Sequence, residues 1–428
     1  MKTLVVIAEG MDPLVLESEV AKGRLPWFSQ RMHAQSYRHL DCGPVPYEPS
    51  NLATAFSGVN PGQHGCFSYW SAHSSGEIPR ILESTDVMSA RLWEWPEMAD
   101  QRFAVINVQL TQPPQPVNGT LITYPMQNSM NTSHPRSLLR DLNGRGVRYA
   151  HDVSLFYTGQ PFEDFATQAY RIAEHQLDTA MALGAEADVM IVNLTLADRL
   201  SHFLWYEMHA PDAAQRPHVL RAYDFIDQAC QRLQSLAPES MLVFSEMGFG
   251  ELSGFFSIDE HLRAAGLQVL DAQGRVDLKR SVALETVQGS HGVMLCADLC
   301  NQGQSSLHQR QLVEQCLRNI RFSDGSPALA QVRHREQVYQ GPYTHLAPTF
   351  IVTPADARRP PLGDPRWANH VRRTSQSGWH RDQGFVLLDG AAIEAPAGAL
   401  QLQQIAPSIA ALSGCAAPAQ CEMPSFVC

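Results

Sequence analysis

The chain has 428 residues, of which 44% are hydrophobic and 18% charged, and its formal net charge is −11. These values are typical of a globular protein with a large buried core and exclude a disordered or fibrous chain. The negative charge, with Lys and Arg scattered rather than clustered, argues against a nucleic-acid-binding protein and favours a small-molecule partner.

Short apolar runs alternate along the chain with long amphipathic stretches. The runs have the length and composition of buried parallel strands and cover residues 4–8, 103–108, 189–194 and 241–245. Helical periodicity extends over residues 162–184 and 218–237. This alternation predicts an α/β fold with a mainly parallel central sheet. We expect one domain over residues 1–428, with an insertion or partial lid at residues 255–345.

The first residues, MKTLVVIAE, have the length of a strand and are too few for a signal peptide or a membrane span. The nine cysteines include no CxxC pair, which argues against a disulfide framework and a cysteine zinc site. We therefore predict a cytoplasmic protein without membrane association. Cys421 and Cys428 are either a reactive pair or, as is commoner in a reducing compartment, two unrelated thiols.

Carboxylates follow three of the predicted strands. Glu9 comes after the first, Asp198 and His202 after the third, and Glu246 after the fourth. In open parallel sheets, functional groups gather beyond the carboxyl ends of the strands. The spacing of Asp198 and His202 places both on one helical face or within one tight loop and is compatible with a shared metal, although such a pair by itself is more often a solvated helix pair.

Within the loop 47–69, the segment SGVNPGQHG fits the pattern TG-x-x-PG-x-HG almost residue for residue. This pattern follows the nucleophile of type I phosphodiesterases in the alkaline phosphatase superfamily, which the sequence therefore resembles. The segments SEMGFGELSGFFSIDEHLRAAGL, SGWHRDQGFVLLDG and IAPSIAALSG resemble later family segments, in the family's order. The resemblance spans nearly the whole chain and implies an alkaline-phosphatase-like three-layer sandwich with insertions.

Carried over position by position, the resemblance makes Asp198, His202 and His380 a complete three-ligand metal site. In the family a second metal is held by an Asp at the first strand end, by the Asp and His of SDHG and by the hydroxyl nucleophile. This sequence has Glu9, Glu246 and Met247 at the first three of those places.

The nucleophile position is the largest departure from the family pattern. Aligning EPSNLATAFSG with the family's TPPAWASLITG places Glu48 where the attacking Thr or Ser stands. Ser50 could replace the nucleophile only if the loop were shifted, and NPGQHG fixes the register without a gap. We therefore favour Glu48 over Ser50 at this position.

The candidate ligands form an oxygen-rich set of four carboxylates and two imidazoles: Glu9, Glu48, Asp198, Glu246, His202 and His380. Two divalent cations would be neutralised by this set, and iron or manganese is favoured over zinc. The thioether of Met247 is too soft to bind a hard cation well. The same ligand inventory occurs in di-iron carboxylate proteins, which have a different fold.

Three functional hypotheses follow from this inventory. The first is a metal-dependent hydrolase of phosphate, phosphonate or related esters, in which metal-activated water attacks and Glu48 is a ligand or general base. The second is a dinuclear iron or manganese enzyme that carries out oxygen-dependent oxidation or bond cleavage. The third is a non-catalytic relative, although three replacements by Glu, which keep charge and oxygen donors, argue against drift.

Two further residues are weaker candidates for substrate binding. Arg199, between two candidate ligands, could bind an anionic substrate or form a plain salt bridge. His64 could contact substrate, but a glycine-rich turn has a sufficient structural reason in its backbone geometry. A homodimer is the commonest assembly of a soluble enzyme, but the sequence leaves the oligomeric state open.

Overall fold

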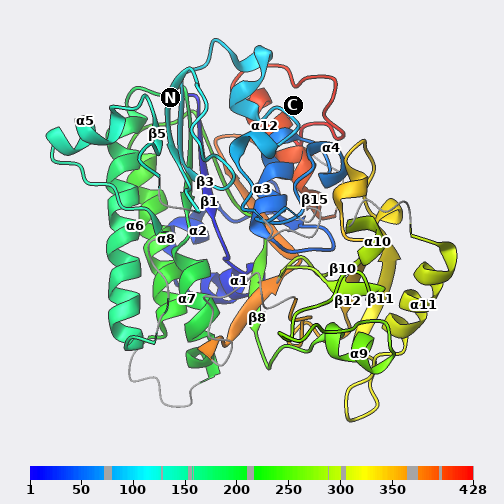
Figure 1. Cartoon of the computed structure of the whole chain (residues 1–428). Coiled ribbons are helices and arrows are strands. Elements are labelled where there is room, and N and C mark those ends of the chain that lie inside the picture. Colours follow the sequence, from blue (N-terminus) through cyan, green and yellow to red (C-terminus); the bar gives the residue numbers. More distant parts are fainter. Residues whose placement is uncertain are drawn as a thin grey trace. The chain divides into compact units, whose positions relative to one another are not determined.

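The computed structural model describes residues 1–71, 80–126, 129–152, 157, 159–209, 216–287, 289–299, 305–363, 375–394 and 398–427 (Figure 1). The chain divides into two compact units. Unit 1 comprises residues 1–59, 83–251 and 372–428, and unit 2 comprises residues 60–82 and 252–371. The predicted insertion at 255–345 belongs to unit 2, and its action as a lid remains a prediction.

Unit 1 is built on a nine-stranded sheet with the order β15-β2-β14-β7-β1-β6-β3-β4-β5. Its strands are β1 (Thr3–Ala8), β2 (Tyr37–Asp41), β3 (Phe103–Val108), β4 (Gly119–Thr123), β5 (Ser133–His134), β6 (Val189–Leu194), β7 (Ser240–Ser245), β14 (Gln383–Asp389) and β15 (Leu400–Gln401). The central strands β7, β1, β6, β3 and β4 are parallel, and β14 and β5 pair antiparallel with their neighbours. The predicted mainly parallel sheet is thus confirmed.

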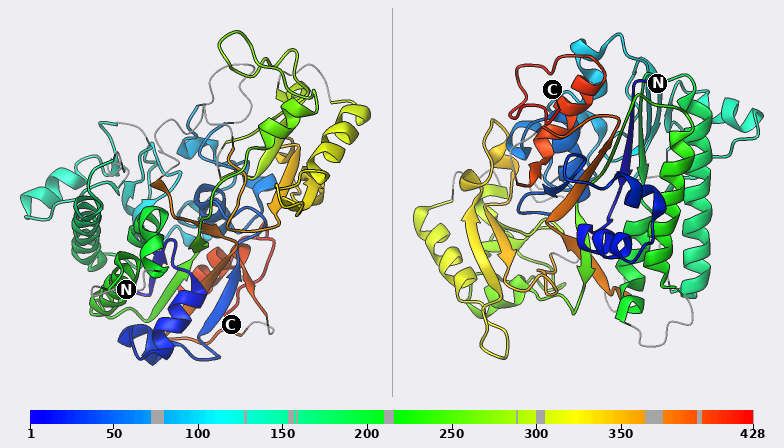
Figure 2. Two further views of the ribbon diagram at one scale, coloured as in Figure 1. Left: turned by 90° about the horizontal axis from the view of Figure 1, so that it is seen from below. Right: turned by 180° about the vertical axis from the view of Figure 1, so that it is seen from behind.

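Both faces of the central sheet are covered by helices, which gives unit 1 three layers (Figure 2). Its α-helices are α1 (Pro13–Ala21), α2 (Pro26–Arg31), α3 (Glu48–Ser57), α5 (Leu138–Gly144), α6 (Phe162–Gly184), α7 (Leu196–Leu204), α8 (His218–Gln234) and α12 (Ile405–Leu412). Its short 3₁₀ helices are η1 (Ser84–Asp86), η2 (Leu92–Glu94), η3 (Pro96–Met98), η5 (Trp205–His209) and η10 (Leu402–Gln404). Helices α6 and α8 lie on one face of the sheet, and α3 and α12 on the other.

Alternate side chains of the central strand supply the two hydrophobic cores. In β1, Leu4, Val6 and Ala8 pack into the core beneath α6 and α8. Val5 and Ile7 point the other way, into the core beneath α3 and α12. A strand that is apolar on both faces can only be satisfied between two helical layers. This burial explains why its sequence is a continuous apolar run.

Unit 1 also contains a two-stranded antiparallel ribbon, β8 (Gly248–Glu251) with β13 (Gly378–Arg381). Unit 2 has a four-stranded antiparallel sheet in the order β11-β12-β10-β9. Its elements are α4 (Pro61–His64), α9 (Ile258–Ala264), β9 (Ala283–Glu285), β10 (Gly292–Leu295), α10 (Cys296–Leu299), α11 (Leu307–Arg318), β11 (Leu329–His334), η6 (Arg335–Gln337), η7 (Thr344–Leu346) and β12 (Phe350–Pro354).

The predicted elements agree closely with the observed ones. The four predicted strands are β1, β3, β6 and β7, and the helix predicted at 162–184 is α6. The second predicted helix, 218–237, ends earlier, at Gln234 in α8, because the N–H groups of Ser235 and Leu236 donate to carbonyls three residues back and close its last turn.

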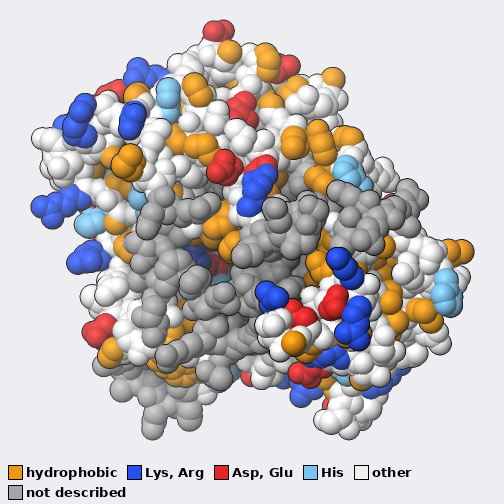
Figure 3. All heavy atoms as spheres, in the orientation of Figure 1, with side chains coloured by type: hydrophobic (Ala, Val, Ile, Leu, Met, Phe, Trp, Pro, Cys, Tyr) orange, Lys and Arg blue, Asp and Glu red, His pale blue; other side chains and the backbone are white. Residues whose placement is uncertain are grey.

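Among the described residues, no helix combines the length and the apolar character that crossing a membrane requires. No disulfide links the cysteines of the described residues; Cys421 is among them, whereas Cys428 lies outside them. On the face drawn in Figure 3, Lys and Arg side chains of the described surface are intermixed with Asp and Glu.

Candidate metal centre

The carboxyl ends of the central strands carry the acidic candidates, as predicted. Glu9 follows β1 and Glu246 follows β7, and both are fully buried. Asp198 lies in the first turn of α7, which begins just beyond β6. Its N–H donates to the carbonyl of Glu9 over 3.1 Å. Gly10, with φ of 76°, permits this contact, because a Cβ there would lie 2.7 Å from the Cα of Asp198.

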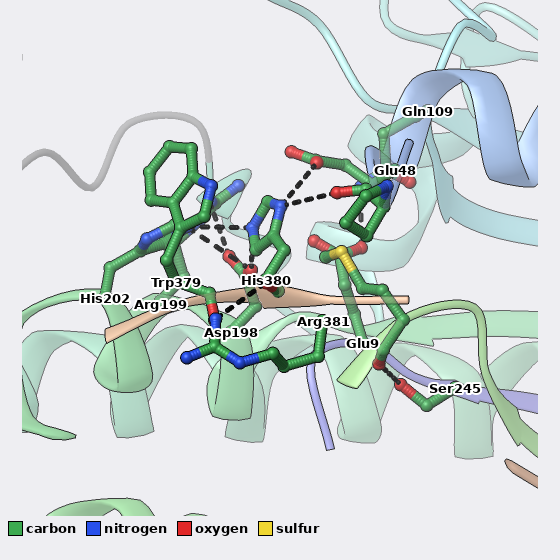
Figure 4. A network of polar contacts seen from close by, with 12 residues as sticks. Glu9, Glu48, Gln109, Asp198, Arg199, His202, Ser245, Trp379, His380 and Arg381 are labelled. Atoms are coloured by element: carbon green, nitrogen blue, oxygen red, sulfur yellow. Dashed lines mark hydrogen bonds and ion pairs between the residues drawn. The ribbon is translucent and has the colours of Figure 1, made fainter. Parts of the chain in front are cut away.

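Asp198, His202 and His380 come together at one point (Figure 4). Nε2 of His380 lies 3.2 Å from Nε2 of His202 and 3.3 Å from Oδ1 of Asp198. The same Asp198 oxygen lies 3.5 Å from Nε2 of His202. Each residue offers a ligand atom within 4.8 Å of the other two. Two imidazole nitrogens and a carboxylate oxygen that converge in this way are a donor set that fits a transition metal or zinc.

The ribbon of β8 and β13 brings His380 to this position. His380 pairs with Phe249 across the ribbon. Gly378 allows β13 to approach α7 closely, because a Cβ there would lie 2.3 Å from the carbonyl oxygen of Ser201. Nδ1 of His380 lies 2.9 Å from the carbonyl oxygen of Pro46. With Nδ1 donating to that carbonyl, Nε2 is left as the free donor atom that faces His202 and Asp198.

The charge states of this trio are shifted by their surroundings. Burial raises the pKa of Asp198, but His202, His380 and Arg199 outweigh burial, and the net pKa is lowered. Burial lowers the pKa of His202 to about 3, so its ring is neutral near neutral pH. Burial would lower the pKa of His380 as well, but Asp198 and Glu48 raise it overall. The negative charge of Asp198 is therefore compensated mainly by His380 and Arg199.

The pKa of each of the other three carboxyl groups is raised. Burial raises the pKa of Glu9, and the charges of Glu246 and Asp198 raise it further. Burial also raises the pKa of Glu246, and Glu48 and Asp198 add to the effect. Glu48 behaves similarly, although His380 partly offsets its burial. These mutual effects show that the four carboxylates act on one another electrostatically.

Glu48 occupies the start of α3 and faces the trio. Its Oε2 lies 3.9 Å from Nδ1 of His380, and Figure 4 shows it on the side of His380 away from His202. Ser50 lies two residues further along α3 and is also buried. A carboxylate in the first turn is favoured there by the partial positive charge of the helix N-terminus.

Arg199 is held by protein groups on three sides. Its Nη1 donates to Oδ2 of Asp198 over 3.0 Å and its Nε donates to Oδ2 of Asp152 over 3.0 Å. Its Nη2 donates to the hydroxyl of Tyr124. Only 18% of the Arg199 side chain is exposed. This geometry favours the salt-bridge interpretation over substrate binding, because each guanidinium nitrogen already has an acceptor.

Sequence reasoning missed the amides that hold Glu9. Oε2 of Glu9 accepts hydrogen bonds from Nε2 of Gln109 over 2.6 Å and from Nδ2 of Asn193 over 2.5 Å. Gln109 directly follows β3 and Asn193 is the penultimate residue of β6, so both lie at the strand ends where functional groups are expected. Neutral amides at strand ends carry no charge that would mark them as candidate ligands in the sequence. Tyr124 and Asp152 carry no comparable sequence signal, since they meet Arg199 only through the fold.

The remaining candidates are placed as follows. Met247 is fully buried, and its carbonyl accepts a hydrogen bond from Oγ of Ser245 over 2.6 Å. His64 belongs to unit 2 and is fully buried at the end of α4, and burial lowers its pKa to about 3. A substrate-binding role of His64 remains a prediction.

Comparison with protein families gives one match over most of the chain. The model of the type I phosphodiesterase / nucleotide pyrophosphatase family matches residues 3–376. No curated protein sequence matches the chain.

Several solved structures share the fold at low sequence identity. Phosphonoacetate hydrolase from Sinorhizobium meliloti 1021, in complex with phosphonoformate, has a TM-score of 0.63 and 14% identity over 96% of this chain and 94% of that chain. Human ectonucleotide pyrophosphatase / phosphodiesterase 5 has a TM-score of 0.58 and 13% identity, with coverage of 100% and 97%. Wild-type alkaline phosphatase PafA has a TM-score of 0.55 and 9% identity, with coverage of 99% and 98%. These likenesses confirm the predicted alkaline-phosphatase-like fold.

Proposed function

Since the chain belongs to the type I phosphodiesterase / nucleotide pyrophosphatase family, we propose that it is a metal-dependent hydrolase of a phosphate or phosphonate ester. The observation that carries the proposal is the convergence of Asp198, His202 and His380 within 4.8 Å of one another. The likeness to phosphonoacetate hydrolase supports including phosphonates among the substrates to be tested.

The residues fit the metals that this family implies. Several buried carboxylate oxygens, namely Glu9 Oε1, Glu48 Oε2 and both oxygens of Glu246, accept no hydrogen bond from the described residues. An uncompensated buried carboxylate is costly, and a bound cation removes the cost. We propose two divalent cations, with iron or manganese favoured over zinc because oxygen donors dominate the set.

The chain's own groups then have distinct roles. Bound cations would supply Lewis acidity that polarises the ester and lowers the pKa of water. Glu48 replaces the usual hydroxyl nucleophile, so the attacking group is water. Glu48 is either a ligand or the general base that accepts the proton of this water. His380 is oriented by Pro46 for its part as a ligand.

Hydrolysis of aryl phosphate monoesters, aryl phosphate diesters and phosphonoacetate, with zinc, manganese or iron added to metal-free protein, tests the proposal. We expect turnover of at least one ester class and its loss on chelation. The substitution Glu48→Thr restores a hydroxyl at the nucleophile position and should change the preferred ester class. No turnover of any ester by fully metallated wild type and Glu48→Thr would contradict the proposal.

The comparisons give no support to the redox hypothesis, which rests on the ligand inventory alone. Metal content and oxidation state of anaerobically purified protein, before and after exposure to oxygen, separate the two. About two irons per chain that oxidise in air would favour oxygen chemistry, as expected for a dinuclear carboxylate centre. A metal that does not respond to oxygen would favour the hydrolase.

A further inference from the structure

Hydrogen bonds do not account for the orientation of the His202 ring. Rotation of an imidazole about its last side-chain bond is broad, so a metal-binding histidine is usually held by a hydrogen bond from its other ring nitrogen. His380 has such a bond, from Nδ1 to the carbonyl oxygen of Pro46 over 2.9 Å. Nδ1 of His202 is buried and makes no hydrogen bond of normal length and angle with the described residues, and the backbone of Gly378 has only a minor effect on the pKa of this ring. Other contacts must therefore fix the His202 ring.

Two buried aromatic rings lie against His202. The ring centroid of Phe249 lies 4.9 Å from that of His202, with the two planes at 83°. The ring centroid of Trp379 lies 5.2 Å from that of His202, with the planes at 62°. Both are edge-to-face arrangements, which aromatic rings favour. Because Phe249 and Trp379 are themselves buried in a closely packed interior, they can hold the imidazole between them.

Trp379 also contacts the second imidazole of the trio. Its ring stacks on that of His380, with a centroid distance of 5.1 Å and an interplanar angle of 15°. The ring centroids of His202 and His380 lie 4.9 Å apart, and Figure 4 shows the indole beside both rings. One side chain therefore limits the rotation of both imidazoles, whereas the carbonyl of Pro46 acts on only one of them.

The backbone of β13 holds the indole in place. Trp379 directly precedes His380 and pairs with Gly250 across the ribbon of β8 and β13. Nη1 of Arg381 donates to the carbonyl oxygens of Trp379 and His380, over 3.0 Å in each case. The backbone from which both rings project is thus fixed independently of the indole. A substitution of Trp379 should therefore change the freedom of the imidazoles more than the course of the chain.

We propose that Trp379 is a positioning residue, whose indole holds the imidazoles of His202 and His380 in the orientation that binds a metal ion. This inference rests on the metal dependence proposed above. For His202, the indole takes the part that a hydrogen-bonding carbonyl or carboxylate plays for most metal-binding histidines. Rings that are already oriented lose less conformational freedom when the ion binds, so the indole raises the metal affinity without being a ligand.

Zinc binding to the full chain, stripped of metal, tests the proposal. In a calorimetric titration, His202→Ala first identifies the part of the binding that belongs to the trio of Asp198, His202 and His380. Trp379→Leu keeps an apolar side chain but removes the ring, and we expect the zinc affinity of the trio to fall about 10- to 100-fold. Trp379→Phe restores a ring that can lie against the imidazoles and should recover most of this loss.

Trp95→Leu is the matched control. Trp95 is also a buried tryptophan of unit 1, but it packs in the core beneath α3 and α12. Its replacement removes the same side-chain volume as Trp379→Leu and should leave the zinc affinity at the wild-type value. Circular dichroism establishes that each variant is folded.

Nuclear magnetic resonance of the metal-free protein, with labelled histidine, observes the imidazoles directly. A ring that is stacked on an indole has its proton signals shifted upfield, so the ring protons of His380 should show this shift in the wild type. The shift should be absent from Trp379→Leu and retained in Trp95→Leu. This measurement requires no metal and no substrate.

Equal zinc affinity in Trp379→Leu and wild type would overturn the inference, as would an equal loss of affinity in Trp379→Phe or in Trp95→Leu. Absence of the upfield shift from the wild type would overturn it as well. Failure of the proposed function is a separate outcome. Weaker zinc binding in Trp379→Leu, without hydrolysis of any ester by the wild type, would leave Trp379 as a positioning residue and refute the hydrolase. Ester hydrolysis by the wild type with equal zinc affinities would do the reverse.

Discussion

Buried carboxylates occur in both units, but they differ in the hydrogen bonds that their oxygens accept. In unit 2, Oε1 of Glu285 accepts the N–H of Gly363 over 3.1 Å, and its Oε2 accepts the N–H of Asp259 over 3.2 Å. Oδ1 of Asp259 in turn accepts the N–H of Glu285 over 2.7 Å. In unit 1, the oxygens of Glu246 accept no hydrogen bond from another described residue, and only the backbone N–H of Glu246 itself acts to lower the pKa of this carboxyl.

This difference distinguishes carboxylates that stabilise the fold from those whose oxygens can bind a ligand. Backbone N–H groups satisfy the oxygens of Glu285 and join β9 to the start of α9, so a structural role accounts for its burial. No comparable partner accounts for the burial of Glu246 within the described residues. Burial of an acid is therefore weak evidence for a metal site, and burial without donors is much stronger.

The largest expected effect comes from removing Asp198 from the trio of Asp198, His202 and His380. Asp198→Asn should lower hydrolytic activity by about 10³-fold or more, because metal ions contribute several kcal/mol of transition-state stabilisation. Initial rates and elemental analysis of the purified variant measure the effect. Asp227→Asn is the matched control, since Asp227 is buried but accepts the N–H groups of Trp27 and Phe28. Equal losses in both variants would indicate a general effect on folding.

A smaller effect, on metal affinity, should follow from substitution of Arg199, which we interpret as a positioning residue for Asp198. Arg199→Lys keeps the charge but replaces three directed donors with one ammonium group. We expect the metal affinity of the trio of Asp198, His202 and His380 to fall about 10- to 100-fold, as for other groups that orient a ligand. Calorimetric titration measures this affinity. Tyr124→Phe removes one of the three contacts and should cause a smaller fall. Unchanged affinity in Arg199→Lys would show that Asp198 is positioned without it.

Much of the fold and part of the site were predictable from the sequence. The apolar runs that form β1, β3, β6 and β7 are buried on both faces of the sheet. Because burial on both faces requires a continuous apolar run, these strands can be recognised in the sequence. Asp198 and His202 could be recognised as a pair because residues four apart lie on the same face of any helix, as they do on α7. His380 required the family resemblance, because it reaches the site through the pairing of β13 with β8.

Other features depend on contacts that no local pattern encodes. Asp152 and Tyr124 meet Arg199 across 47 and 75 residues of chain. The hydrogen bonds of Gln109 and Asn193 to Glu9 span 100 and 184 residues. Whether a buried carboxylate has donors is likewise a property of the folded chain, so the distinction between Glu246 and Glu285 could not be drawn from the sequence.

The smallest expected effect concerns the buried Glu285 of unit 2. Burial, with a contribution from Asp259, raises the pKa of Glu285 from 4.5 to about 8. The folded protein therefore keeps this proton up to about pH 8, whereas the unfolded chain releases it above about pH 4.5. The stability that this proton contributes is fully present below pH 4.5 and is lost as the pH rises to about 8, at up to about 1.4 kcal/mol per pH unit.

Glu285→Gln removes the ionisable group, so its free energy of unfolding should fall less than that of wild type between pH 5 and pH 8. Urea unfolding of the metal-free proteins across this range measures the two slopes. Glu260→Gln, in the first turn of α9, provides an exposed control that should keep the wild-type slope. Identical slopes in Glu285→Gln and wild type would mean that the backbone donors hold Glu285 ionised. Hydrogen bonds would then suffice to keep an acid charged in this interior, and the unpaired oxygens of Glu246 would stand out all the more as a site for a cation.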